Sequence, residues 1–111
     1  MDKIVIGVIE KVIILGPNKR EILAKIDTGS FNSSIDVKLA SELKMGPIIK
    51  SRKIKSSHGS ATRPMVEGKI EIKGIKLDAL FHIADRKELR YQVLIGRKTL
   101  HNHFLVDPSK Q

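Results

Sequence analysis

The sequence places an aspartate in a setting that suits proton-transfer chemistry, at Asp27-Thr28-Gly29-Ser30. Residues 21–26 have the pattern of a strand and run straight into this tetrapeptide, so the carboxylate is predicted to stand at a strand end. Glycine has no Cβ and lets a second backbone approach closely. Two carboxylates held close together share one proton, and the pair then contains both the base that activates water and the acid that protonates the leaving group. These residues therefore allow amide hydrolysis if a second carboxylate reaches Asp27.

A second segment supports this interpretation. Residues 26–30 (Ile-Asp-Thr-Gly-Ser) resemble the active-site signature of aspartic proteases, and residues 93–97 (Val-Leu-Ile-Gly-Arg) resemble the Gly-Arg segment that retropepsins carry one short domain later. Both the order and the separation fit. The chain is most similar to the retropepsin-like family labelled putative ATP-dependent zinc proteases, through three blocks: residues 25–29, residues 55–57 with Arg63-Pro64, and residues 95–97 followed by 104–108.

The resemblance implies a fold and an assembly. The fold is mainly all-β, a retropepsin-like closed acid-protease barrel with one or two short helices, and it would take in residues 1–111 as a single domain. A retropepsin contributes one aspartate per chain, so the functional unit would be a homodimer with Asp27 of each copy on the two-fold axis.

The resemblance also implies roles for the neighbours of Asp27, which would itself be the catalytic residue. Thr28 would hydrogen-bond across the axis, and Gly29 would complete the supporting loop. The hydroxyl of Ser30 can donate to the carboxylate and favour its charged form, which predicts activity shifted to acid pH.

Two further groups of residues take implied roles. The flap that contacts the substrate would be Ser57, His58, Gly59 and Ser60. Structural support for the catalytic loop would come from Ile95, Gly96 and Arg97. The flap is polar and lacks the Gly/Ile-rich run of retroviral flaps, so it is expected to grip substrate differently.

The sequence departs from the retroviral pattern at Phe31. Retroviral enzymes usually have an acidic residue there, and it pairs with the arginine of the Gly-Arg segment. Arg97 must therefore find another partner, for which Asp107 is a candidate.

Simpler interpretations exist for the same residues. Asp27 can be a loop aspartate that caps its own turn through its side chain. Gly96-Arg97 can be a helix start with a surface arginine.

The sequence predicts no metal site and no cofactor. The four histidines lack metal-ligand spacing and include no His-Glu-x-x-His element; they are His58, His82, His101 and His103. The chain also lacks a Gly-rich phosphate loop followed by Lys-Ser or Lys-Thr, which argues against ATP binding.

The elements that must position these residues can be read from apolar spacing and turn residues. A helix is expected over residues 37–44, with Asp36 as its N-cap. The expected strands and turns are an amino-terminal hairpin or meander over 4–15, a strand over 21–26, a long hairpin over 48–74 with its tip at 56–60, strands over 75–84 and 91–95, and helical turns over 97–103.

Composition sets broad limits. A chain of 111 residues with 41% hydrophobic content suits one modest core, and a domain of this size gains readily from packing against a partner. With no cysteine, disulfides and thiol chemistry are excluded. The first residues are too short an apolar run for a signal segment or a membrane span, so we expect a soluble cytoplasmic protein with no membrane partner.

The leading hypothesis is a homodimeric aspartic endopeptidase that hydrolyses peptide bonds. Related proteins are associated with ATP-grasp ligases that add glutamate to protein tails, and a formal charge of +9 would attract such an acidic, glutamate-rich substrate. The alternative is a non-catalytic binding module that uses its basic surface for an acidic partner or nucleic acid. With few aromatic residues and no tryptophan to stack bases, nucleic acid is the weaker choice.

Overall fold

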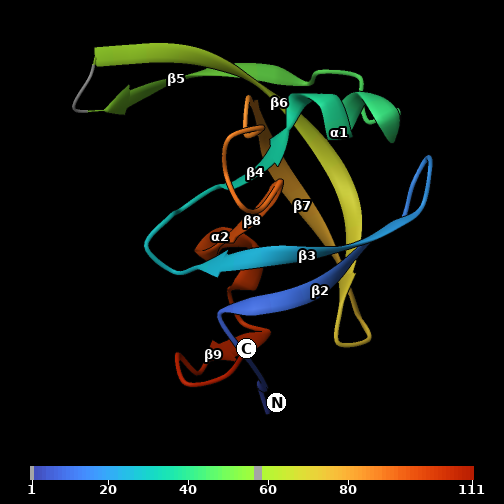
Figure 1. Cartoon of the computed structure of the whole chain (residues 1–111), viewed down its shortest axis with the longest axis vertical. Helices are drawn as coiled ribbons and strands as arrows, with labels where there is room; N and C mark the ends of the chain where they lie inside the picture. Colours follow the sequence, from blue (N-terminus) through green and yellow to red (C-terminus); the bar gives the residue numbers. More distant parts are fainter. Residues whose placement is uncertain (1, 57–58) are drawn as a thin grey trace.

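The computed structural model describes residues 2–56 and 59–111, and most of them form β-strands (Figure 1). The strands are β1 (Ile4–Ile6), β2 (Ile9–Ile14), β3 (Arg20–Asp27), β4 (Ser33–Asp36), β5 (Lys50–Ser56), β6 (Gly59–Ile72), β7 (Ile75–Ala84), β8 (Val93–Gly96) and β9 (Phe104–Val106). Within these residues, six strands pair in the order β2-β3-β8-β4-β7-β6, and β6 pairs back onto β2 to close a barrel. The predicted mainly β, closed barrel is confirmed.

The barrel interior is apolar because alternate residues of its strands point inward. Val12 and Ile14 of β2 are fully buried and lie opposite Ile72 and Ile70 of β6, in the register that closes the barrel. Phe81 of β7 is fully buried in the same core. Full burial of each side chain of this size contributes about 2 to 3 kcal/mol relative to exposure. The closure is therefore held by apolar packing as well as by backbone hydrogen bonds.

Two short helices lie among the described residues, as predicted. Helix α1 (Val37–Glu42) ends two residues earlier than expected, and its N-cap is the predicted Asp36, whose side chain accepts hydrogen bonds from the backbone N–H groups of Lys38 and Leu39. Helix α2 (Arg97–Leu100) covers the first part of the helical turns predicted after the Gly-Arg segment. Neither helix is long and apolar enough to cross a membrane.

Residues 4–15 contain two strands, β1 and β2, but these strands do not pair with each other, so the predicted hairpin or meander is wrong. β1 leaves the barrel and pairs in parallel with β9, in register from Ile4 with Phe104. Between β1 and β2 the chain passes close to the backbone of Lys110. Glycine at Gly7 permits this approach, because a Cβ there would overlap the Lys110 carbonyl. Val8 N–H donates to the same carbonyl at 3.0 Å. The strand that follows, β2, instead forms an antiparallel hairpin with β3.

Strand β4 was not predicted. It pairs in parallel with β7 and antiparallel with β8, which places it in the barrel wall after the loop that follows Asp27. Its buried residues include the polar Ser33 and Asp36, and both make side-chain hydrogen bonds. A strand that buries polar groups lacks the apolar alternation on which the prediction depended.

The predicted long hairpin is present. β5 and β6 pair in register from Lys50 with Met65 to Ser56 with Gly59. Figure 1 shows this hairpin extending well beyond the barrel, on the same side as the loop that follows β3. Of the predicted flap residues, Gly59 and Ser60 begin β6, whereas Ser57 and His58 lie outside the described residues.

Candidate active site

Asp27 is the last residue of β3, as predicted, and its position is fixed by the barrel. β3 and β8 pair in parallel, with Asp27 opposite Gly96, so the two sequence segments singled out for chemistry lie side by side. Ile26 anchors the strand end, because its side chain is buried and its N–H donates to the Val8 carbonyl at 2.8 Å. The carboxylate of Asp27 thus starts from a rigid strand end.

The Asp27 carboxylate organises the loop that follows it. Oδ1 accepts the backbone N–H of Gly29 at 2.9 Å, and Oδ2 accepts the hydroxyl of Ser30 at 3.1 Å, which is the hydrogen bond expected from the sequence. Asp27 is half-buried, whereas Thr28 and Gly29 are exposed. A turn-capping aspartate makes the same bonds. The two interpretations therefore differ in what reaches the exposed side of this loop.

The start of α2 holds the far end of the loop that follows Asp27. Arg97 N–H donates to the Ser30 carbonyl at 2.8 Å, and Lys98 N–H donates to the Phe31 carbonyl at 3.1 Å. The contact requires glycine at Gly96, because a Cβ there would overlap the Asn32 carbonyl. Gly96 thus permits a backbone-to-backbone approach that any side chain would block.

A buried hydroxyl pair adds to this support and was missed by sequence reasoning. Ser33 Oγ accepts the Gly96 N–H at 3.0 Å and lies 2.8 Å from the Thr99 hydroxyl. Both side chains are buried. Two small polar residues at distant positions in the sequence give no periodic signal that would reveal the pair.

The partner of Arg97 is Phe31 rather than Asp107. The Arg97 guanidinium lies over the Phe31 ring at 5.5 Å from its centroid, and Nη1 donates to the Thr28 carbonyl at 3.3 Å. Asp107 accepts hydrogen bonds from Ser109 instead, and these bonds lower the pKa of its carboxyl. The aromatic face therefore takes the place of the carboxylate that retroviral enzymes offer to this arginine.

Asp36 and Arg86 form a second polar connection near the loop. Asp36 Oδ1 accepts the backbone N–H of Arg86 at 2.7 Å, while its other oxygen caps α1. Burial is the main cause that lowers the pKa of the Arg86 guanidinium, and the positive charge of Arg63 lowers it further. The carboxylates of Asp36 and Asp27 act in the opposite direction and raise this pKa. Arg86 thus lies within electrostatic reach of both Arg63 and Asp27, which sequence spacing did not indicate.

Other features lie away from Asp27. A hollow of about 480 Å³ is lined by Leu15, Pro17, Gly46 and neighbouring residues, and it contacts none of the residues predicted for the site. Within residues 2–56 and 59–111, no cluster of three or more histidine, aspartate or glutamate residues could hold a metal ion. His101 and His103 are both exposed.

Comparison with known proteins identifies this architecture. The structure of a Legionella pneumophila protein of unknown function is similar, with a TM-score of 0.71, 19% identity, and coverage of 97% of this chain and 95% of that chain. Simian foamy virus protease matches with a TM-score of 0.62, 16% identity, and coverage of 82% of this chain and 89% of that chain. The foamy viral protease-reverse transcriptase bound to an RNA/DNA hybrid has a TM-score of 0.63 and 20% identity, with coverage of 83% of this chain and 11% of that chain. These identities establish the fold alone.

The family comes from sequence. No curated protein matches the chain. A family model described as the retropepsin-like aspartic endopeptidase RimB matches residues 38–111, which include the β5–β6 hairpin and the Gly-Arg segment and begin after Asp27. The chain belongs to the RimB-like family of retropepsin-like aspartic endopeptidases.

Proposed function

We propose that two copies of this chain assemble with their Asp27 loops on a common two-fold axis and hydrolyse peptide bonds. In this assembly the two Asp27 carboxylates share one proton and activate a water molecule between them. One carboxylate takes a proton from the attacking water, and the protonated partner supplies one to the substrate. The carboxylate of a single chain would lack the acid half of this pair.

The observation that carries the proposal is the Asp27 loop itself. Its carboxylate is ordered by Gly29 N–H and Ser30 Oγ from within the chain, while Thr28 and Gly29 remain exposed beside it. An exposed edge without side-chain bulk at Gly29 can accept a second backbone. This exposed edge supports the proposed contact with an identical loop, and membership of an endopeptidase family supports the reaction type.

An acidic polypeptide is the substrate class that the charge favours. The formal net charge is +9, and residues 45–66, which contain β5 and the part of β6 that pairs with it, hold five lysines and arginines and no aspartate or glutamate. A cationic hairpin raises the local concentration of an anionic chain and its rate of encounter. We therefore include acidic, glutamate-rich protein tails among the proposed substrates.

Replacement of Asp27 by asparagine tests the catalytic role. Asparagine at this position keeps the size of the side chain and can still accept the Gly29 N–H bond, but it cannot share a proton. Cleavage of an acidic peptide by Asp27→Asn should fall by about 10³-fold or more, and binding of the same peptide should survive. Loss of binding together with cleavage would point to misfolding, and unchanged cleavage would exclude Asp27 from the chemistry.

Mixed dimers test the requirement for two aspartates. If wild-type and Asp27→Asn subunits exchange freely at equal concentration, about a quarter of the dimers contain two wild-type copies, because pairing is random. Activity should then fall to about half of its value for the same amount of wild-type subunit alone, since only those dimers carry the pair. Activity that stays equal to that of the wild-type subunits alone would show that each copy works by itself.

A further inference from the structure

Strand β6 has one stretch of edge where a neighbouring strand is missing. Ile49 N–H donates to the Met65 carbonyl at 3.0 Å, just before β5 begins. Leu15 N–H donates to the Lys69 carbonyl at 2.9 Å, just after β2 ends. Glu67 lies midway between these two carbonyls. In the described part of the chain, neither β2 nor β5 pairs with it, so a gap separates the two strands along this edge.

The register of β6 with β7 turns the Glu67 backbone toward this gap. Ile72 lies opposite Ile75 across a two-residue turn, and residues that close such a turn exchange both of their backbone hydrogen bonds. Residues farther along the strand alternate between bonds to one neighbour and bonds to the other. The carbonyls of Met65 and Lys69 follow this alternation, because both accept bonds on the edge away from β7. Glu67 therefore presents its N–H and its C=O on the same edge.

The gap opens into the hollow of about 480 Å³, whose lining includes Glu67 and residues from both borders of the gap. Leu15 and Pro17 supply apolar surface there, and Gly16 and Gly46 border the hollow without side chains. A Cβ at Gly16 would meet no atom within 4 Å. Ligand sites of this size combine apolar walls with a few placed polar groups, which include backbone N–H and C=O groups. The Glu67 backbone supplies one group of each kind.

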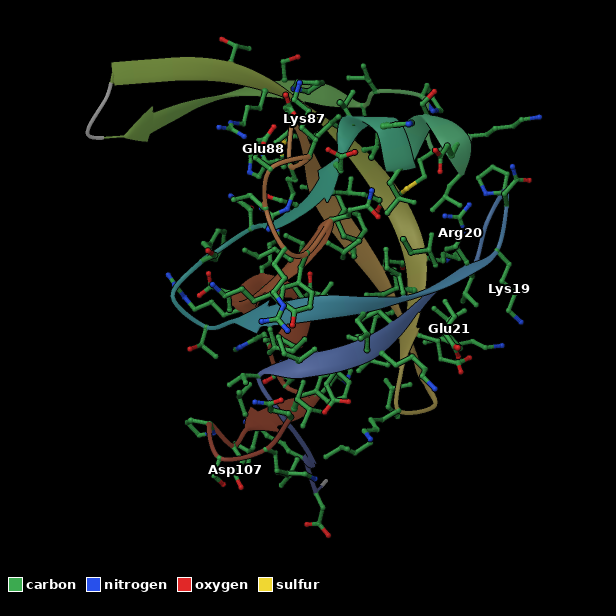
Figure 2. The ribbon with its side chains drawn as sticks, in the orientation of Figure 1. Lys19, Arg20, Glu21, Lys87, Glu88 and Asp107 are labelled. Carbon is green, nitrogen blue, oxygen red and sulfur yellow. The ribbon has the colours of Figure 1, made fainter. Side chains whose placement is uncertain are left out.

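The β2–β3 hairpin does not cover this edge, because its tip is tied to α1. Asn18 N–H donates to the Leu43 carbonyl at 3.3 Å, and Asn18 Nδ2 donates to the Glu42 carbonyl at 3.1 Å. Figure 2 shows Arg20 at the start of β3, and its Nη1 lies 3.7 Å from Glu42 Oε2. Figure 1 shows the connection between β2 and β3 rising from β6 toward α1. These contacts keep the hollow beside Glu67 open.

An N–H beside a C=O restricts the chemistry of the ligand. The Glu67 N–H needs an acceptor, and the Glu67 carbonyl needs a donor. A carboxylate offers acceptors alone, and an ammonium or guanidinium group offers donors alone, so each leaves one of the two groups unsatisfied. A primary carboxamide carries an acceptor and a donor side by side in one plane. It can therefore bind both groups of Glu67 at once.

The charges around the hollow disfavour an anionic ligand. Lys69 Nζ is engaged by Asp78 Oδ1 at 2.7 Å. The Glu67 side chain is exposed, and it makes no ion pair with another residue that the structure describes. The unpaired charge at the rim is thus negative and repels carboxylates and phosphates.

We infer that the gap in β6 binds a compact ligand through a primary carboxamide, whose oxygen accepts the Glu67 N–H and whose nitrogen donates to the Glu67 carbonyl. The rest of the ligand would contact Leu15 and Pro17. β2 and β5 reach the two borders, so the gap admits a group about one or two residues long and not a continuous added strand. The hollow contacts none of the residues around Asp27, so the inference is independent of the proposed peptidase function.

Benzamide and two analogues test the pattern of donor and acceptor. N,N-dimethylbenzamide keeps the acceptor but has no N–H, and benzoate has acceptors and a negative charge. In two-dimensional NMR of the backbone amides, benzamide should shift the Glu67 signal and leave the Gly29 signal beside Asp27 unchanged. It should bind about tenfold more tightly than either analogue, because each analogue leaves the Glu67 carbonyl without a donor. Equal affinities, or no shift of Glu67 with benzamide, would overturn the inference.

Glu67→Pro tests the backbone donor. Proline removes the N–H but no bond to β7, because that N–H faces the gap, and Val66 before it has the strand conformation that proline requires. Benzamide binding, followed through the Lys69 amide, should weaken by about tenfold. Glu67→Ala is the matched control, because it keeps the N–H and should bind as the wild type does. Unchanged binding to Glu67→Pro, or an equal loss in both variants, would overturn the inference.

Gly16→Leu keeps the inference testable if the proline variant does not fold. A leucine side chain can enter the hollow, since a Cβ at Gly16 meets no atom, and it should weaken benzamide binding by about tenfold. Gly16→Ala is the control and should bind almost as the wild type does; similar midpoints of urea unfolding would show that both variants are folded. Wild-type affinity in Gly16→Leu would place benzamide elsewhere and overturn the inference. An extended alanine peptide that shifts Glu67 when benzamide does not would also overturn it, in favour of an added strand.

Discussion

The Asp27 loop and the β5–β6 hairpin extend on the same side of the barrel, but they are attached to it differently (Figure 1). The loop is bonded along its length to the start of α2, through Ser30, Phe31 and Ser33. The hairpin is joined to the core near Met65 and Val66, which are fully buried, whereas Thr62 and Gly59 farther out are exposed. The Asp27 loop thus lies on a packed support, and the hairpin forms an extended arm.

This difference matches the demands of the proposed reaction. Two carboxylates must meet within a narrow range of distances to share a proton, so the proposed reaction is favoured when several contacts hold the Asp27 loop in one position. A polypeptide substrate must enter and leave, so the segment that covers it benefits from weaker attachment. The comparison predicts that substitutions in the loop's support lower both stability and activity, while those in the outer hairpin spare stability.

The largest effect is expected for Gly96→Ala. A Cβ would overlap the Asn32 carbonyl, so the loop or α2 must shift, at a cost of about 3 kcal/mol in the free energy of unfolding. Urea unfolding measures this cost through the midpoint. Gly16→Ala is the control, because a Cβ there meets no atom within 4 Å. It should leave stability unchanged or raise it slightly. Equal midpoints of urea unfolding for the two variants would show that the loop's support does not require glycine at Gly96.

Ser33→Ala should have the next largest effect. It leaves the Gly96 N–H and the Thr99 hydroxyl without their buried partner, which costs about 2 kcal/mol. Ser34→Ala is the control on the same strand, because Ser34 makes no side-chain hydrogen bond within the described residues and should change stability by less than about 0.5 kcal/mol. Thermal and urea unfolding check both values. A neutral Ser33→Ala would mean that water replaces the lost hydroxyl.

The sequence indicated the segments of the candidate site that carry a recognisable motif. Asp27-Thr28-Gly29 and Gly96-Arg97 were singled out because they resemble two retropepsin segments, and the fold brings the two segments into register. The closed barrel followed from the resemblance and is confirmed. What failed was pairing that depends on distant partners, as in the place of β1 beside β9.

Polar pairs were hidden for a similar reason. Ser33 and Thr99 are 66 residues apart in the sequence, and nothing in their local pattern distinguishes a buried hydroxyl pair from two surface residues. The partner of Arg97 was sought among carboxylates, although an aromatic face also attracts a guanidinium. Sequence spacing reports which face of a strand is apolar, but it does not report which polar groups meet across the barrel.

Phe31→Ala should have a smaller effect than either core substitution. Phe31 is 48% exposed, and its loss removes the stacking of Arg97 and Lys98, worth about 0.5 to 1 kcal/mol. Phe31→Asp offers Arg97 a carboxylate instead. Its stability should therefore fall more steeply than that of the wild type as salt is added, because exposed ion pairs are screened. Identical salt dependence of unfolding in Phe31→Asp and in the wild type would show that the introduced carboxylate does not reach Arg97.

The smallest effect on stability is expected for Thr62→Ala in the outer hairpin. The Thr62 side chain is exposed on β6, opposite Lys53 of β5, so its removal should change the free energy of unfolding by less than about 0.5 kcal/mol. Thr99→Ala is the matched substitution in the other region, where the hydroxyl is buried against Ser33 and its loss should cost more. If urea unfolding gave equal losses for the two threonines, the hairpin would belong to the same cooperative unit as the catalytic loop. The division between a packed support and an extended arm would then fail, because covering the substrate would require motion of the core itself.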